Sequence, residues 1–168
     1  IDNEEKLFGH GISYCAICDG SLYKNKTVAY IGENNIQRDL NYLSNLCSKV
    51  IYVGNSKYNE SLNITNIKYY NSIEFYGKTT VEGVKIDNIN YDVDGVFIES
   101  SMNTSNVTIV DLSKENNFII VDEQMKTNID GLFAAGDNNK KALRQISTAI
   151  SDGAIASVSV LNYLKSRK

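Results

Sequence analysis

A strand, a helix and a second strand follow one another within about 28 residues, and this unit limits the fold more than any other feature of the chain. Lys26–Ile31 is a short, β-branched run ending at Gly32, which predicts a buried strand. Apolar residues recur at helical spacing over Asn35–Cys47. Lys49–Val53 predicts a second buried strand. Two strands joined through a helix form a βαβ unit, so we expect a Rossmann-like α/β fold around a parallel sheet.

The rest of the chain predicts short strands and one long helix. Between Lys57 and Tyr91 the pattern changes to short alternating segments, which favour antiparallel strands. Further strands are expected toward the C-terminus, and a helix is expected from about Lys141 to Leu164. The expected antiparallel strands are Asn66–Tyr70, Ile73–Tyr76, Val84–Ile86 and Ile89–Tyr91; the later strands are Gly95–Ile98, Asn117–Asp122 and Leu132–Ala135; the buried stripe of the helix is Leu143, Ile146, Ile150, Ala154, Val158 and Leu161.

Charge and hydropathy exclude several classes of protein. The 17 basic and 20 acidic residues give a net charge of −3 with no basic stripe, so nucleic-acid binding is not expected. No apolar run approaches the roughly 18 to 20 residues that cross a bilayer, so no membrane association is expected. The opening residues, Ile1–Lys6, are acidic and polar, unlike a signal peptide. Three cysteines do not make a secreted disulfide framework, so a cytoplasmic protein is expected.

Two of the cysteines, Cys15 and Cys18, form a C-x-x-C pair followed by Asp19. At a helix N-terminus this spacing allows a disulfide, and the helix dipole lowers the pKa of the first thiol. A carboxyl group at Asp19 could deliver and accept the protons of dithiol–disulfide exchange. A structural, chemically inert pair is the alternative.

Metal binding is a second alternative for this pair. His10, Cys15, Cys18 and Cys47 could supply four ligands in principle. However, Cys47 falls on the apolar face of its predicted helix, and the sequence has no second C-x-x-C. Thiol redox chemistry is therefore favoured, and no metal site is assigned.

The segment Gly9–Gly20 resembles the redox-active segment of the low-molecular-weight thioredoxin reductases, which are FAD-containing flavoproteins. Three further segments continue the resemblance: Tyr42–Asn45 after the nucleotide loop, Asp122–Asp137 as the second FAD motif, and Arg144–Ala154 in the flavin-contacting helix. The resemblance implies a central domain over residues 9–93, preceded by a crossover at residues 1–8. It implies that residues 94–168 are the C-terminal part of a split FAD domain, whose first half is not in this sequence.

The resemblance also implies roles for single residues. Cys15 would attack the disulfide of thioredoxin and Cys18 would face the flavin. On the FAD side, Gly136 and Asp137 would bind the ribityl or phosphate region, and Arg144, Gln145 and Ile146 would lie along the isoalloxazine. The residues themselves agree in part: small side chains at Ala134–Gly136 let backbone approach a ligand closely. The alternatives are an ordinary strand-to-helix turn capped by Asp137, and a surface charge at Arg144.

Two departures from the family concern the pyridine nucleotide. The G-x-G-x-x-A loop is replaced by Gly32–Gln37, in which Glu33 puts a negative charge where a pyrophosphate would lie. After Val53, the basic cluster that reads a 2′-phosphate is replaced by Gly54–Lys57, and no acidic residue is placed to bind a ribose diol. The segment Ile98–Ser101 also replaces the usual glycine-containing turn.

These observations predict a thiol–disulfide oxidoreductase that passes electrons from FAD through Cys15–Cys18 to thioredoxin. The lost nucleotide motifs resemble the ferredoxin-dependent branch of the family, so reduced ferredoxin is the expected donor, and the family implies a homodimer. Two alternatives stay open: a conventional NADPH-dependent thioredoxin reductase with a drifted loop, and a non-catalytic relative.

Overall fold

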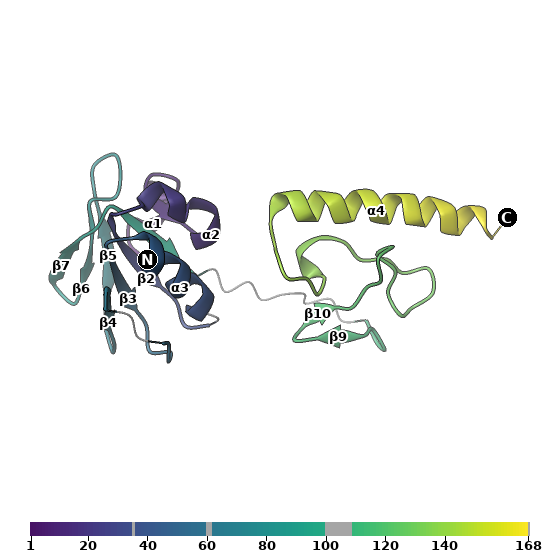
Figure 1. Ribbon diagram of the computed structural model, residues 1–168, viewed down its shortest axis with the longest axis horizontal. Coiled ribbons are helices and arrows are strands. Elements are labelled where there is room, and N and C mark those ends of the chain that lie inside the picture. Colours follow the sequence, from purple (N-terminus) through teal and green to yellow (C-terminus); the bar gives the residue numbers. More distant parts are fainter. Residues whose placement is uncertain (35, 60–61, 100–108, 168) are drawn as a thin grey trace. The chain divides into compact units, whose positions relative to one another are not determined.

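The computed structural model describes residues 1–34, 36–59, 62–99 and 109–167 and divides into two compact units, Ile1–Ser101 and Met102–Lys168 (Figure 1). The first unit contains a five-stranded parallel sheet in the order β1-β8-β2-β3-β4. Its strands are β1 (Ile12–Ser13), β2 (Thr27–Ile31), β3 (Lys49–Val53), β4 (Ile64–Ile67) and β8 (Gly95–Ile98). Helix α3 (Ile36–Leu46) connects β2 to β3, so the α/β class and the βαβ unit are confirmed.

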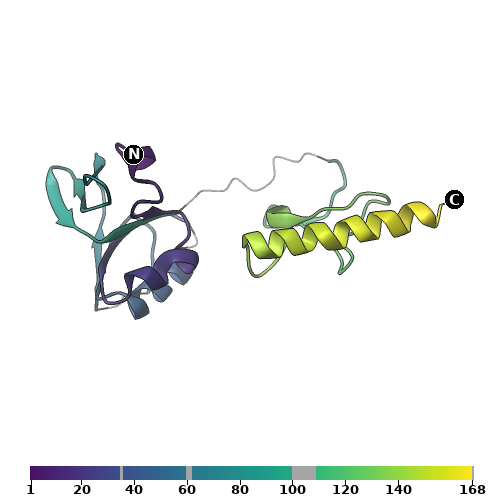
Figure 2. The ribbon, with the colours of Figure 1, turned by 90° about the horizontal axis from the view of Figure 1, so that it is seen from above.

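Both faces of this sheet are covered by other elements, and side chains alternate between the two faces along each strand. On one face Val28 and Tyr30 pack with Leu40 of α3, and α2 (Ala16–Asp19) lies on the same side. On the other face Ala29 and Ile31 pack against a three-stranded antiparallel sheet and α1 (Glu4–Leu7) (Figures 1 and 2). The strands of that second sheet are β5 (Ile73–Tyr76), β6 (Gly83–Ile86) and β7 (Ile89–Asp92).

One expectation for the first unit differs from the structure. The strand expected at Asn66–Tyr70 is β4, and it pairs in parallel with β3 instead of antiparallel. Alternation along a strand predicts that it is half-buried, but it carries no information on the direction of its partner. β8 pairs with both β1 and β2 within the first unit. The expected division into residues 1–8, 9–93 and 94–168 stays a prediction.

The second unit contains less regular structure than expected. β9 (Lys114–Glu115) and β10 (Phe118–Ile119) form a hairpin whose two turn residues, Asn116 and Asn117, have φ of 49° and 67°. The strand expected over Asn117–Asp122 is thus only two residues long. Leu132–Ala135 is not a strand: in the described residues it makes one isolated bridge, between Lys126 and Phe133, because no neighbouring strand offers a row of partners.

Helix α4 (Ile146–Lys165) also departs from its predicted bounds and burial. It begins at Ile146, because the backbone N–H of Gln145 donates to Oγ1 of Thr148 at 3.0 Å in a reciprocal capping box. Within the described residues its expected buried stripe is exposed, and Ile146 keeps 81% of its surface. The apolar spacing therefore predicts one face of the helix, but residues 109–167 do not cover that face. No helix in the described residues combines the length and hydropathy needed to span a membrane.

Candidate functional site

Cys15 and Cys18 are joined by a disulfide, with their Cα atoms 5.2 Å apart. Cys15 is the N-cap of α2, and its sulfur accepts a hydrogen bond from the backbone N–H of Cys18 at 3.2 Å. Cys15 is half-buried, whereas Cys18 is exposed. The structure therefore places the pair at the start of a helix, where this spacing allows a disulfide, and one of the two cysteines is exposed. The third cysteine, Cys47, is buried, and burial raises the pKa of its thiol.

Ser13 connects Asp19 to the backbone of Cys15. Its buried hydroxyl donates to Oδ2 of Asp19 at 2.6 Å and accepts from the backbone N–H of Cys15 at 3.0 Å. Asp19 is thereby fixed beside the disulfide, where a proton carrier is useful. Sequence reasoning did not assign Ser13 a role, although it is the last residue of β1 and lies two residues before Cys15.

Tyr23 stays protonated in the surroundings of Asp19. Burial and the charges of Asp19 and Asp94 raise the pKa of Tyr23 above its ordinary value. Gly20 follows α2, and a Cβ there would lie 2.6 Å from Cε1 of Tyr42 on α3. This close packing fixes α2, and with it the disulfide, on the face of the parallel sheet.

The turn between β2 and α3 binds a carboxylate from within the chain. Glu99 follows β8, and its Oε2 accepts the backbone N–H groups of Glu33 and Asn34, each at 2.7 Å. A Cβ at Gly32 would lie 2.6 Å from the Cβ of Glu99, so the two segments are in close contact. Sequence reasoning singled out Glu33 but treated Glu99 only as part of Ile98–Ser101, whose last two residues lie outside the described residues.

Glu33 makes a second set of contacts across the same turn. Its carboxylate accepts the backbone N–H of Asn55 at 3.0 and 3.1 Å and the hydroxyl of Ser56 at 3.2 Å. The hydroxyl of Tyr52 donates to the backbone oxygen of Gly32 at 3.2 Å, and burial raises the pKa of this tyrosine. The segment after β3 is thus tied to the turn after β2.

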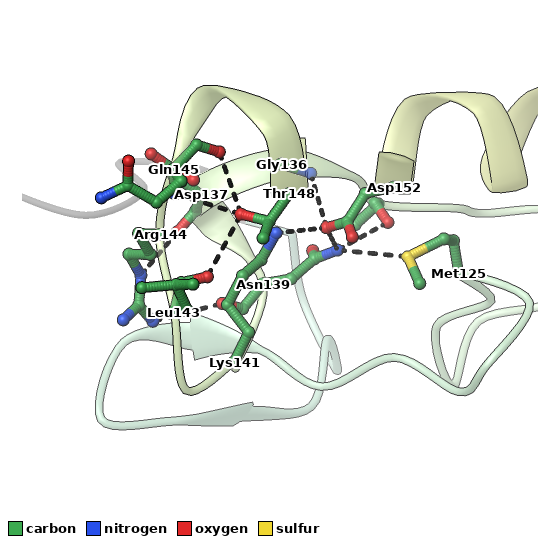
Figure 3. A network of polar contacts seen from close by, with 11 residues as sticks. Met125, Gly136, Asp137, Asn139, Lys141, Leu143, Arg144, Gln145, Thr148 and Asp152 are labelled. Carbon is green, nitrogen blue, oxygen red and sulfur yellow. Dashed lines mark hydrogen bonds and ion pairs between the residues drawn. The ribbon is translucent and has the colours of Figure 1, made fainter. Parts of the chain in front are cut away.

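In the second unit Asp152 is the centre of a polar network (Figure 3). Its carboxylate accepts from the backbone N–H of Gly136 at 3.1 Å, from the side-chain amide of Asn139 at 3.3 Å and from the ammonium group of Lys141. Burial opposes the charge of Asp152, but these hydrogen bonds outweigh it, so the pKa of the carboxyl lies below its ordinary value.

Arg144 and Gln145 support the backbone around this network. The Arg144 side chain donates to the backbone oxygens of Asp137 and Asn139, each at 3.2 Å, and its guanidinium lies 3.6 Å from the ring centre of Phe118. Gln145 caps α4, and Ile146 is exposed. The flavin contacts expected of Arg144, Gln145 and Ile146 stay predictions.

The same loop has an oxygen available for a ligand. Oδ1 of Asp137 is buried and has no hydrogen-bond partner within the described part of the chain, which is costly unless a ligand or water supplies a donor. The adjacent Gly136 has φ of 84° and only the Cβ of Ala149, at 4.0 Å, near its open side. An unpaired carboxylate oxygen beside a residue without a side chain fits the hydroxyl-rich ribityl chain of a flavin. Gly136, Asp137, Arg144 and Gln145 are therefore together in the second unit, whereas Cys15, Cys18 and Asp19 are together in the first.

Comparison with known proteins places the chain among disulfide oxidoreductases. The family model for pyridine nucleotide-disulphide oxidoreductases matches residues 58–153. The thioredoxin reductase of Ureaplasma parvum is 39% identical over 98% of this chain and 60% of that protein. The thioredoxin reductase of Mycoplasma pneumoniae is 36% identical over 98% of this chain and 59% of that protein.

Two solved structures share the fold. The thioredoxin reductase of Streptococcus pyogenes covers 94% of this chain and 58% of its own, with 30% identity and a TM-score of 0.80. A ferredoxin-flavin thioredoxin reductase of Clostridium acetobutylicum covers 99% of this chain and 59% of its own, with 32% identity and a TM-score of 0.58. The chain thus spans no more than 60% of the length of these relatives. It belongs to the pyridine nucleotide-disulphide oxidoreductase family.

Proposed function

We propose that this chain carries the redox-active disulfide of a flavin-dependent thioredoxin reductase. The observation that carries the proposal is the Cys15–Cys18 disulfide at the start of α2, with Asp19 held beside it by Ser13. The names of the relatives support thioredoxin as the electron acceptor. In this proposal the protein is a cytoplasmic homodimer, as the resemblance implies.

The chemistry at the disulfide is thiol exchange. In the reduced protein, the thiolate of Cys15 forms a bond to one sulfur of the thioredoxin disulfide, and the second thioredoxin sulfur leaves as a thiolate that takes a proton. The thiolate of Cys18 then attacks the sulfur of Cys15, which restores the Cys15–Cys18 disulfide and releases reduced thioredoxin. The carboxyl of Asp19 supplies and recovers the protons of these steps.

The second unit would hold the flavin. We assign to it the unpaired Oδ1 of Asp137 and the space left by the absent side chain of Gly136. When bound, FAD supplies the electron pair that opens the Cys15–Cys18 disulfide. Arg144 holds the backbone oxygens of Asp137 and Asn139, and Gln145 caps α4 directly after it.

We assign the electron supply to reduced ferredoxin instead of NADPH. Support comes from two carboxylates. That of Glu99 accepts the backbone N–H groups of the turn after β2, and that of Glu33 accepts the backbone N–H of Asn55 after β3. Conventional NADPH-dependent reduction is the second candidate, favoured by the description of the family model that matches residues 58–153.

Anaerobic reduction of the flavin tests the proposal. The full-length, FAD-loaded protein is mixed in turn with NADPH, NADH and reduced ferredoxin, and loss of the visible absorption of oxidised flavin is followed. We expect loss with ferredoxin alone, followed by reduction of thioredoxin. Rapid loss with NADPH establishes the second candidate. No thioredoxin reduction by a fully reduced flavin contradicts the disulfide chemistry itself.

A further inference from the structure

We propose that Glu99 and Glu33 fill, from within the chain, the positions in which a dinucleotide would be bound, and that Glu99 is the residue that excludes it. The inference deepens the donor assignment and rests on the proposed function only for the choice of a pyridine dinucleotide as the ligand. The binding of that ligand can be measured without flavin or thioredoxin.

Strand order places both glutamates at the crevice where such ligands bind. β2 continues through α3 to β3 on one side, whereas its neighbour on the other side is β8. In open α/β sheets, ligands bind outside the carboxyl ends of the strands at this reversal of strand order. Glu33 follows β2 and Glu99 follows β8, so both lie beyond the carboxyl ends of these two adjacent parallel strands.

The backbone amides at this turn are already paired. A dinucleotide-binding turn offers its N–H groups and the helix N-terminus to the pyrophosphate. Here the N–H groups of Glu33 and Asn34 both donate to Oε2 of Glu99 at 2.7 Å. Hydrogen bonds to an ionised acceptor are short and strong, so the carboxylate is an effective substitute for a phosphate oxygen.

Glu33 repeats this arrangement at the next strand. The end of β3 is the position from which such folds recognise the ribose or its 2′-phosphate. Just after β3, the backbone N–H of Asn55 donates to both carboxylate oxygens of Glu33. The hydroxyl of Ser56 also donates to this carboxylate. A ligand would therefore have to displace two carboxylates and then lie beside their charges, which repel a phosphate.

The remaining glycine of the turn fits this interpretation. A side chain at Gly32 would lie 2.6 Å from the Cβ and 2.8 Å from the Oε2 of Glu99. In a dinucleotide-binding turn, glycines allow the backbone to approach the pyrophosphate. In this chain, the absence of a side chain at Gly32 allows the carboxylate of Glu99 to approach.

The test measures binding at the turn in the full chain by following backbone amide resonances. Wild type, Glu99→Ala and Glu33→Ala/Glu99→Ala are titrated with inorganic pyrophosphate and with NADPH. Glu5→Gln removes one exposed negative charge elsewhere in the first unit and is the matched control. We expect the Glu33 and Asn34 signals to move on titration in Glu99→Ala, with an affinity at least about tenfold above wild type and the control.

Each result decides the proposal. Wild-type protein that binds NADPH through these amides overturns it, and so does a folded Glu99→Ala protein with no gain in affinity. If Glu99→Ala unfolds, Glu99→Gln retains the acceptor oxygen without the charge and is judged by the same criterion. Because no thioredoxin is present, failure here is separate from failure of the disulfide chemistry.

Discussion

The hydroxyl oxygen of Ser13 lies 2.6 Å from Oδ2 of Asp19 and also accepts the backbone N–H of Cys15. One buried side chain therefore connects the proposed proton carrier to the cysteine that begins α2. The sequence pattern of the two cysteines and Asp19 does not predict that Ser13 connects them. It makes Ser13 a positioning residue for the exchange reaction.

Ser13→Ala should slow disulfide exchange with thioredoxin about tenfold or more, because Asp19 loses the donor that orients it. Asp19→Asn should slow it by a similar or larger factor. The double variant should be little slower than Asp19→Asn, since the two residues act through one contact. Stopped-flow exchange rates measure this, with Ser21→Ala as the control. Fully additive losses would mean that Ser13 acts independently of Asp19.

Cys18→Ser should trap a mixed disulfide between Cys15 and a thioredoxin that lacks its own second cysteine. The trapped species follows from attack by Cys15, because no resolving thiol remains. Mass spectrometry of the adduct identifies the linked cysteine, and Cys47→Ala controls for the buried third thiol. Since Cys18 is the more exposed of the two residues, an adduct with Cys15→Ser instead would reverse the assigned order of attack.

The parallel core could be predicted from the sequence because local patterns determine it. The bounds of β3, β5 and β8 agree with the expected strands, and α3 differs from its expected range by one residue at each end. The direction of β4 could not be predicted, because it depends on a partner distant in the sequence. Leu132–Ala135 has strand-like composition but lacks strand neighbours in the described residues.

In the candidate site, too, contacts between residues close in sequence could be predicted, whereas contacts between distant residues could not. Cys15, Cys18 and Asp19 are adjacent in sequence, so their grouping could be predicted. Glu99 and Asn34 are 65 residues apart, and only the pairing of β8 with β2 brings them together. The exposed stripe of α4 has a related cause: periodicity predicts an apolar face but not whether another segment covers it.

The second unit should lose stability in acid through Asp152. The folded pKa of this carboxyl is below its unfolded value of about 3.9, so its contribution is complete above that pH and is lost as pH falls through the folded pKa. Protection of the Gly136 amide against hydrogen exchange, measured in the full chain across this range, should fall accordingly. Asp152→Asn should show less protection and a flatter pH dependence. An unchanged dependence would show that Asp152 does not contribute.

Replacing Lys141 separates the ion pair from the hydrogen bonds of the same carboxyl. Lys141→Met removes a cation whose side chain is 15% exposed and leaves the donors from Gly136 and Asn139 in place. Burial then opposes the charge with less compensation, so the pKa of Asp152 should rise and the acid transition should move to higher pH. The chemical shift of the side-chain carboxyl carbon of Asp152 reports this pKa directly. No upward movement would mean that the backbone and amide donors alone hold the carboxyl ionised.

Gly54→Ala and Gly153→Ala should change stability in opposite directions. A Cβ at Gly54 would lie 2.3 Å from the backbone oxygen of Gly32, which cannot move without opening the turn after β2, so a cost of about 1–3 kcal/mol is expected. Gly153 lies within α4, and a Cβ there would meet no atom of the described residues within 4 Å outside the helix itself. Alanine at this position should therefore stabilise the helix by about 0.5–1 kcal/mol.

Denaturant unfolding followed by amide signals from each unit measures both changes. The loss of stability in Gly54→Ala should appear in the first unit, and the gain of stability in Gly153→Ala should appear in the second. Equal shifts from the two substitutions would contradict the steric argument. Because the Gly32 oxygen also accepts the Tyr52 hydroxyl, Gly54→Ala should at the same time weaken the protection of the Glu33 and Asn34 amides. That loss would show that the packing after β3 supports the turn that holds Glu99.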